Sequence, residues 1–165
     1  MIAGIDGGLD GGIVVLDDEG SVLWKYVAPV IGQKGKGKRQ YNVPEMARMI
    51  REIRERGESL VFLERAQAMP GQGVSSMFSI GYGYGIWQGI LTAVGVPFEI
   101  ASPRMWQGVM FSGVSAADTK KASALVAGRL KPHEDWRATE RSRISHSGLT
   151  DAFCIAEWGR RKSLL

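Results

Sequence analysis

The order of apolar segments along the chain constrains the fold more than any other feature of the sequence. Three short apolar runs, at residues 1–6, 12–17 and 21–28, are joined only by the turn sequences GGLDGG and DDEGS. Short apolar runs punctuated by such turns predict an antiparallel meander of three strands. Because helical and strand patterns alternate along the rest of the chain, the sequence predicts an α/β protein.

Helical spacing of apolar residues, together with capping residues, predicts four helices. Asn42 and Glu45 have the spacing of a capping box at the start of the first helix, and Gly57 follows it as a stop signal. Ser115 is expected to open the third helix, with Asp118 three residues later. The predicted helices cover residues 43–56, 75–94, 115–130 and 148–161.

Two further apolar runs, at residues 60–63 and 97–101, predict strands, and Glu64 closes the first of them. The polar segments 32–40 and 131–145 are expected to be loops. The resulting order, β-β-β-α-β-α-β-α-α, is the ribonuclease H-like pattern, with a five-stranded mixed sheet flanked by helices. No linker or repeat interrupts residues 1–165, so we expect one domain.

Composition excludes several classes of protein. No apolar run reaches the roughly 18 residues of a membrane span, and the start MIAGIDGG lacks the pattern of a secretion signal. One cysteine, Cys154, excludes an internal disulfide and a cysteine-based zinc site, and only two histidines exclude a histidine-rich metal cage. A formal net charge of +4 permits a polyanionic partner without requiring one. Any metal must therefore be held mainly by carboxylates, which favours Mg²⁺ or Mn²⁺.

Three acidic residues are the candidate metal ligands. Asp6 and Glu64 each end an apolar strand, and Asp151 lies in the first turn of the last predicted helix, where Ala152 and Ala156 leave room for close packing on the sheet. If the two strands are neighbours, their carboxylates meet at one edge and repel each other. A divalent cation relieves that repulsion, and two ions about 4 Å apart would activate a water and stabilise the leaving oxygen of a phosphodiester.

Each acid also has a purely structural interpretation. Asp6 can serve the turn in IDGGLDGG, and Asp151 can complement the dipole of its helix. Glu64 is harder to explain in this way, because a glutamate directly after a buried strand is costly unless something binds it. Taken singly, Asp6 and Asp151 favour the structural interpretation. The three together, in this order of elements, favour a catalytic site.

Beyond these residues, the sequence resembles the RuvC-like Holliday junction resolvases of the small type carried by phages and related to the poxvirus enzymes. The resemblance spans nearly the whole chain and rests on GIDGGLDGGIVVLD, LERAQAMPGQG, SIGYGYGIWQGIL, PRMW and SGLTDAFCIAEWGRR. It implies a ribonuclease H-like fold and a homodimer. It also implies paired, symmetric nicks across a four-way DNA junction that depend on Mg²⁺, with Mn²⁺ as a substitute. We expect the protein in the cytoplasm, which is that of a bacterial host if a phage encodes it. Asp6, Glu64 and Asp151 match the acidic site of that family.

The sequence departs from the family pattern at two places. The family usually has another acid, or a histidine, three to five residues before the last aspartate, where this chain has His146, Ser147 and Gly148. Ser147 is expected to cap the last helix. His146 is then the candidate for the fourth catalytic role, at the metal, at the phosphate or in proton transfer, with a simple loop histidine as the alternative. Relatives also often have a lysine where this chain has Gln107.

Several residues are candidate DNA contacts. The segment GQKGKGKRQ concentrates four cations on a glycine-rich stretch, and two lysines open the third helix; these are Lys34, Lys36, Lys38, Arg39, Lys120 and Lys121. The basic residues Arg160, Arg161 and Lys162 are expected to solubilise the surface. In similar resolvases an apolar side chain from the region after the glutamate stacks at the centre of the junction. Met69 is the matching candidate, with Phe78 next, although a core position is favoured for Phe78.

The helix predicted from Ser75 to Val94 is too apolar all round for a surface helix and is expected to pack on both sides. Gly81, Gly85 and Gly89 fall on one face of it, and each costs about 1 kcal/mol relative to alanine in a helix. We expect this helix to form the dimer interface, with buried area from Tyr82, Tyr84, Ile86 and Trp87. The alternative is packing against the sheet of its own subunit alone.

Two other functions remain open from the sequence. An actin-like or sugar-kinase phosphotransferase shares the fold and the opening aspartate-glycine turn, but its nucleotide site needs two such domains. A catalytically weak module that only binds branched DNA would be consistent with Ser147 and Gln107. The three carboxylates argue against it.

Overall fold

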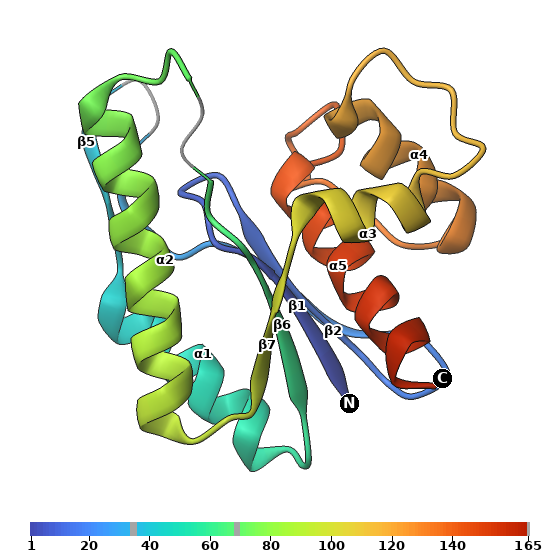
Figure 1. Ribbon diagram of the computed structural model, residues 1–165, viewed down its shortest axis with the longest axis horizontal. Coiled ribbons are helices and arrows are strands. Elements are labelled where there is room, and N and C mark those ends of the chain that lie inside the picture. The colour runs from blue at the N-terminus through green and yellow to red at the C-terminus, as the bar shows by residue number, and fades with distance from the viewer. Residues whose placement is uncertain (34–35, 68–69, 165) are drawn as a thin grey trace.

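A five-stranded mixed sheet forms the centre of the protein (Figure 1). The computed structural model describes residues 1–33, 36–67 and 70–164. Strands β1 (Ile2–Asp6), β2 (Gly12–Leu16) and β3 (Val22–Val27) form the antiparallel meander, and β6 (Leu60–Glu64) and β7 (Phe98–Ala101) extend it in parallel beyond β1. The order β3-β2-β1-β6-β7 confirms the predicted ribonuclease H-like sheet.

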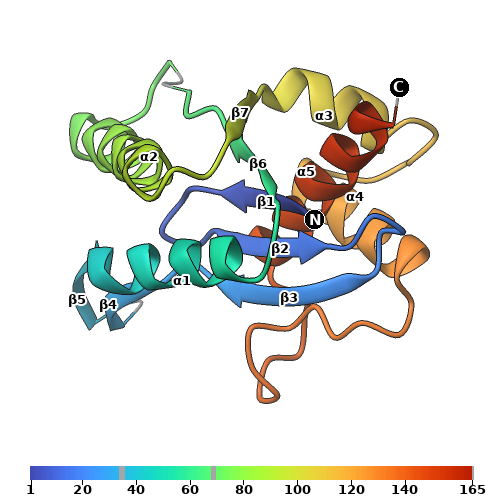
Figure 2. The same cartoon turned by 90° about the horizontal axis from the view of Figure 1, so that it is seen from below.

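Helices cover both faces of this sheet. α3 (Pro103–Met110), α4 (Thr119–Leu130) and α5 (Ser147–Ser163) lie on one side, and α1 (Val43–Glu55) and α2 (Val74–Val94) lie on the other (Figures 1 and 2). Because side chains alternate across a strand, β6 supplies both cores. Phe62 packs under α5, whereas Val61 and Leu63 pack under α1 and α2.

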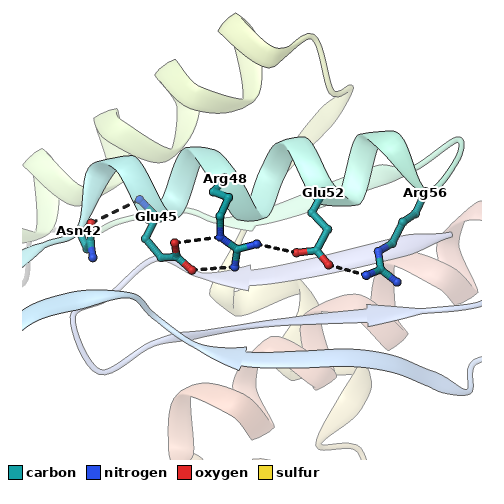
Figure 3. Close-up of polar contacts among 5 residues, drawn as sticks. All are labelled: Asn42, Glu45, Arg48, Glu52 and Arg56. Atoms are coloured by element: carbon teal, nitrogen blue, oxygen red, sulfur yellow. Dashed lines mark hydrogen bonds and ion pairs between the residues drawn. The ribbon is translucent and has the colours of Figure 1, made fainter.

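Helix α1 shows how the local sequence sets an element. The Asn42 side chain accepts a hydrogen bond from the backbone N–H of Glu45, as the capping box predicts. The Glu45 carboxylate does not return to the cap, because it binds Arg48 in a ladder that continues through Glu52 to Arg56 (Figure 3). The ladder is exposed and contributes little, so burial of the apolar face holds α1 in place.

Two glycines let α5 approach the sheet closely. A Cβ atom at Gly4 would lie 2.2 Å from the backbone oxygen of Ala152, and one at Gly148 would lie 2.2 Å from that of Asp10. No side chain fits in either place without moving backbone. The first half of α5 is therefore seated directly on β1 and on the turn that follows it.

The predicted loop at 32–40 is wrong. Strands β4 (Val30–Gln33) and β5 (Lys36–Tyr41) form a separate antiparallel pair, with Val30 opposite Tyr41. Arg39 anchors it through two bonds to the Asp10 carboxylate, at 2.8 and 3.0 Å. The apolar residues at its two ends are too few to show a strand pattern locally, so the pairing is visible only in three dimensions.

Within the described single chain α2 packs on one side only, so its packing on both sides stays a prediction that needs a second subunit. The buried residues of α2 are Gly83, Trp87 and Leu91, on one face. Gly81, Gly85 and Gly89 are exposed, and a Cβ at any of them would meet no described atom within 4 Å. An apolar helix without polar periodicity indicates burial but does not say by which partner.

Helix boundaries differ from the predictions at three points. The segment after Ser102 forms α3, which was not predicted, although Pro103 at its first position is a helix-start signal. Asp118, rather than Ser115, caps α4 by accepting from the N–H of Lys121. The N-cap of α5 is His146, so Ser147 is its first residue. Asp151 therefore lies past the first turn. Among the described residues, no helix has the length and apolar character that a membrane span requires.

Candidate active site at the carboxyl ends of β1 and β6

Parallel pairing of β1 with β6 brings Asp6 and Glu64 to the same edge of the sheet. Ile5 lies opposite Leu63, so the next residue of each strand projects from adjacent strand ends. Both acids line a cleft of 290 Å³, together with Arg65 and Tyr84. The N–H of Arg65 donates to Ala101 at 2.8 Å and thereby continues the sheet to the cleft.

Asp151 reaches this edge from α5, because the close seating of that helix brings it beside Asp6. The electrostatic effects show the proximity of all three acids. Burial is the main cause that raises the pKa of Glu64 to about 8, and the charges of Asp6 and Asp151 add to it. Burial and the charge of Asp6 raise the pKa of Asp151 to about 7, and burial raises the pKa of Asp6 itself.

Each of these carboxylates is held by a neutral donor. The N–H of Gly8 donates to Asp6 Oδ1 at 3.1 Å, and the indole N–H of Trp106 donates to Glu64 Oε1 at 3.0 Å. A hydrogen bond from the Ser123 hydroxyl lowers the pKa of Asp151. Within the described part of the chain, none of the three acids forms an ion pair.

Buried Glu157 provides the contrast. Its carboxylate binds the guanidinium groups of Arg160 and Arg161, at 2.8 Å each. Although burial opposes it, these partners hold the pKa of Glu157 below its ordinary value. A carboxylate that serves structure is thus neutralised by cations of the chain itself, whereas the three acids at the sheet edge have no ion-pair partner among the described residues and hold their protons to higher pH.

The donor set at the sheet edge fits a divalent metal ion. Three partly buried carboxylates supply the hard oxygen ligands that Mg²⁺ and Mn²⁺ prefer. No three His, Cys, Asp or Glu side chains of the described residues already stand in an arrangement that could hold a metal ion. The fit is therefore one of ligand chemistry and not of a preformed cluster among the described residues.

Lys120 is the cation that acts on this site. Its charge lowers the pKa of Asp6 and of Asp151. Lys121, the other lysine predicted to bind DNA, is an exposed neighbour whose backbone N–H meets the Asp118 cap. Gln107 follows Trp106 in α3.

His146 has a structural role in the backbone. Its N–H donates to the carbonyl of Trp136 at 2.7 Å, and its carbonyl accepts from Leu149 and Thr150 at the start of α5. The charges of Asp6 and Lys120 act on the pKa of Asp151. A catalytic role for His146 stays a prediction.

The predicted DNA contacts lie in different environments. Lys34 and Met69 fall outside the described residues, and Lys36 and Lys38 lie on β5. Arg39 is neutralised by Asp10. At the other end of the chain, Arg160 and Arg161 bind Glu157, and Lys162 binds Glu99, in line with the surface role expected for them.

Two predictions about aromatic residues of α2 are wrong. Phe78, for which a core position was favoured, is 73% exposed and stacks on Tyr82 with ring centroids 6.1 Å apart. Trp87 is 0% exposed and packs in the core beneath the Asp6 turn, so it cannot supply area to a dimer interface. Their positions follow from which side of α2 faces the sheet, which the apolar pattern of the helix does not encode.

The sequence reasoning missed two residues that support the site. Trp106 belongs to the segment PRMW, and its hydrogen bond to Glu64 joins residues 42 positions apart in the chain. Tyr41 donates from its hydroxyl to the carbonyl of Gly7 at 3.1 Å and so ties β5 to the turn after Asp6. Pro103 signals the helix that carries Trp106, but no local signal indicates the contact of Tyr41.

Comparison with known proteins agrees with the architecture. The sequence matches no protein-family model and no curated protein. Among solved structures, RuvC of Thermus thermophilus in complex with a Holliday junction substrate is similar, with a TM-score of 0.65 and 19% identity over 99% of this chain and 94% of that one. Thermus thermophilus RuvC gives 0.57 and 22%, over 99% and 95%. The yeast mitochondrial Holliday junction resolvase Ydc2 gives 0.58 and 14%, over 97% and 77%.

These likenesses define a class of fold. The chain has the ribonuclease H-like fold. The particular variant is that of RuvC, which it matches over nearly its whole length.

Proposed function

We propose that this protein is a metal-dependent endonuclease that resolves four-way DNA junctions by paired, symmetric nicks. The observation that carries the proposal is the gathering of Asp6, Glu64 and Asp151, each without an ion-pair partner in the described structure, at one edge of the sheet. Similarity in fold to RuvC bound to a Holliday junction supports the choice of substrate. The segments GIDGGLDGGIVVLD, LERAQAMPGQG and SGLTDAFCIAEWGRR favour the phage and poxvirus type, and we expect residues 1–165 to act as one domain.

Asp6, Glu64 and Asp151 would hold Mg²⁺, with Mn²⁺ as a substitute. When bound, a pair of such ions supplies an activated water and stabilises the leaving oxygen of the phosphodiester. Lys120 offsets part of the negative charge of the site and attracts the phosphate. His146 stands near the start of α5 as the candidate for a phosphate contact or a proton transfer.

The DNA-binding surface extends from this edge. Lys36 and Lys38 belong to β5, and Arg39 fixes the β4–β5 pair on Asp10. These two lysines, together with Lys34 from outside the described residues, would follow the phosphate backbone. An apolar side chain holds the centre of the junction open. Met69 keeps that role from the resemblance, and the exposure of Phe78 now makes it an equal candidate. Because the substrate is DNA, we expect the protein in the cytoplasm, that of a bacterial host if a phage encodes it.

A homodimer through α2 would supply two sites for two nicks. The exposed face with Gly81, Gly85 and Gly89 supports this interface, because glycines allow close backbone approach. Gly85→Glu tests it: the mass measured by light scattering should fall from dimer to monomer. An unchanged dimer mass would contradict this interface.

Cleavage of a synthetic four-way junction, compared with a linear duplex of the same arms, tests the function. We expect Mg²⁺-dependent nicks at symmetric positions of the junction and none in the duplex. Asp6→Asn should abolish cutting and keep junction binding. Binding without cutting by the wild type would favour the branched-DNA binding module. Absence of binding, with hydrolysis of nucleoside triphosphates, would favour the phosphotransferase.

A further inference from the structure

A buried donor, the indole N–H of Trp106, fixes the carboxylate of Glu64. Trp106 Nε1 lies 3.0 Å from Glu64 Oε1, and the tryptophan is 1% exposed. The register explains the meeting, because Glu64 pairs with Ala101 at the end of β7 and α3 begins two residues later. Trp106 therefore stands beside the candidate metal ligand through the backbone of the sheet.

Packing holds the indole ring of Trp106 in one orientation. Phe111 meets it edge-on, with ring centroids 5.3 Å apart and an interplanar angle of 78°. The ring belongs to the core cluster between the sheet and α5, with Ala101 and Met110. A donor that cannot turn away gives its acceptor a fixed direction.

The chemistry of the indole suits a ligand-orienting role. An indole N–H is a neutral donor, so it satisfies one oxygen of Glu64 without adding a compensating positive charge. Glu157 has the opposite environment, since Arg160 and Arg161 bind both of its oxygens and neutralise it. The site thus keeps the carboxyl group of Glu64 oriented and available to an external cation.

We propose that Trp106 is a positioning residue, whose indole N–H holds Oε1 of Glu64 and thereby presents Oε2 to the divalent metal ion. This inference rests on the proposed function, because it takes Glu64 as a ligand of that ion. Supporting groups of this kind typically change metal affinity by about 10- to 100-fold when removed.

The test compares Trp106→Phe with Trp136→Phe. Phenylalanine keeps an aromatic ring at position 106 and removes the donor together with some buried volume, a loss of volume that Trp136→Phe reproduces. Trp136 is a matched control, because it is 5% exposed and its indole nitrogen has no hydrogen-bond partner in the described structure. Calorimetric titration with Mn²⁺ should give a roughly tenfold weaker affinity for Trp106→Phe and an unchanged affinity for Trp136→Phe.

Cleavage kinetics separate orientation from folding. The Mn²⁺ concentration for half-maximal junction cleavage should rise by about the same factor in Trp106→Phe, while the rate at saturating Mn²⁺ stays close to that of the wild type. Equal Mn²⁺ affinity in Trp106→Phe and the wild type would overturn the role of Trp106 alone. A wild type that binds no Mn²⁺ would overturn both this role and the proposed function.

A measurement on the unaltered protein remains decisive if Trp106→Phe does not fold. The indole N–H signal of Trp106 is identified in a ¹H–¹⁵N spectrum through its proximity to the Phe111 ring. Addition of Mg²⁺ should shift it, because the acceptor then shares its charge with the ion, whereas the indole signal of Trp136 should stay in place. An indole N–H signal of Trp106 whose chemical shift does not change on addition of Mg²⁺ would refute the inference.

Discussion

Replacing Glu64 by glutamine should stabilise the metal-free protein. Burial and two neighbouring acids raise the pKa of Glu64 from 4.5 to about 8. Between these two values the unfolded chain carries the negative charge while the folded chain holds the proton. The free energy of unfolding therefore falls as the pH rises through this window and levels off above about 8. Glutamine has the same shape, carries no charge and still accepts the hydrogen bond from the indole N–H of Trp106. The free energy of unfolding of Glu64→Gln should therefore not fall through this pH window.

The size of the effect follows from the rise in pKa. At about 1.4 kcal/mol per pKa unit, the rise from 4.5 to about 8 corresponds to roughly 5 kcal/mol at most. Relaxation of a partly open cleft and coupling to Asp6 and Asp151 reduce it, so we expect about 2–3 kcal/mol. Below about pH 4.5 the carboxyl is protonated in both states, and the difference between variant and wild type should vanish.

Urea unfolding in EDTA at about pH 4.5, 6.5 and 8.5 measures this difference directly. We expect the two proteins to be equal at the lowest pH and to diverge steadily as the pH rises, with Glu64→Gln the more stable. Addition of Mg²⁺ at the highest pH should stabilise the wild type more than Glu64→Gln. If Glu64→Gln is less stable than the wild type at about pH 8.5 in EDTA, the ionised Glu64 carboxylate does not destabilise the folded protein, and the reasoning is refuted.

Three further predictions follow from individual contacts. Gly4→Ala should lower the free energy of unfolding by about 2–3 kcal/mol, because the added Cβ would overlap the backbone of α5. Gly128→Ala, where a Cβ meets no described atom within 4 Å, should raise the free energy of unfolding by up to about 1 kcal/mol. Urea unfolding of both variants measures these changes. Lys120→Gln should slow junction cleavage at least tenfold, and Lys121→Gln should leave it within about twofold, in single-turnover assays. Replacing the two lysines of β5 by glutamine should make the slope of log affinity against log salt about 2 units shallower in a binding titration; an unchanged slope would exclude them from the phosphate contacts.

The sheet could be predicted from the sequence because each of its strands has a local sequence pattern. The runs before Asp6 and Glu64 are apolar, short and bounded by turns, and their order along the chain is enough to define the topology. The edge where both acids lie then follows from parallel pairing of β1 and β6. The position of Asp151 also depends on the close packing of α5 against the sheet. Ala152 and Ala156 indicate this packing in the sequence, and Gly4 and Gly148 make room for it in the structure.

The missed features depend on contacts between residues far apart in the chain. Trp106 binds Glu64 across 42 residues, and Arg39 binds Asp10 across 29, so neither pair leaves a local pattern. The exposure of Phe78 was missed for a different reason. An apolar sequence predicts that a helix is buried. It does not indicate whether the sheet of the same subunit or a second subunit buries it.

The most direct measurement of the central claim is anomalous scattering from a crystal grown or soaked with Mn²⁺. Our account predicts a metal peak bonded to carboxylate oxygens of Asp6, Glu64 and Asp151 at about 2.0–2.3 Å, with Trp106 still hydrogen-bonded to Glu64. A Mn²⁺ ion bound elsewhere in a crystal of active protein, with these three carboxylates empty, would contradict it.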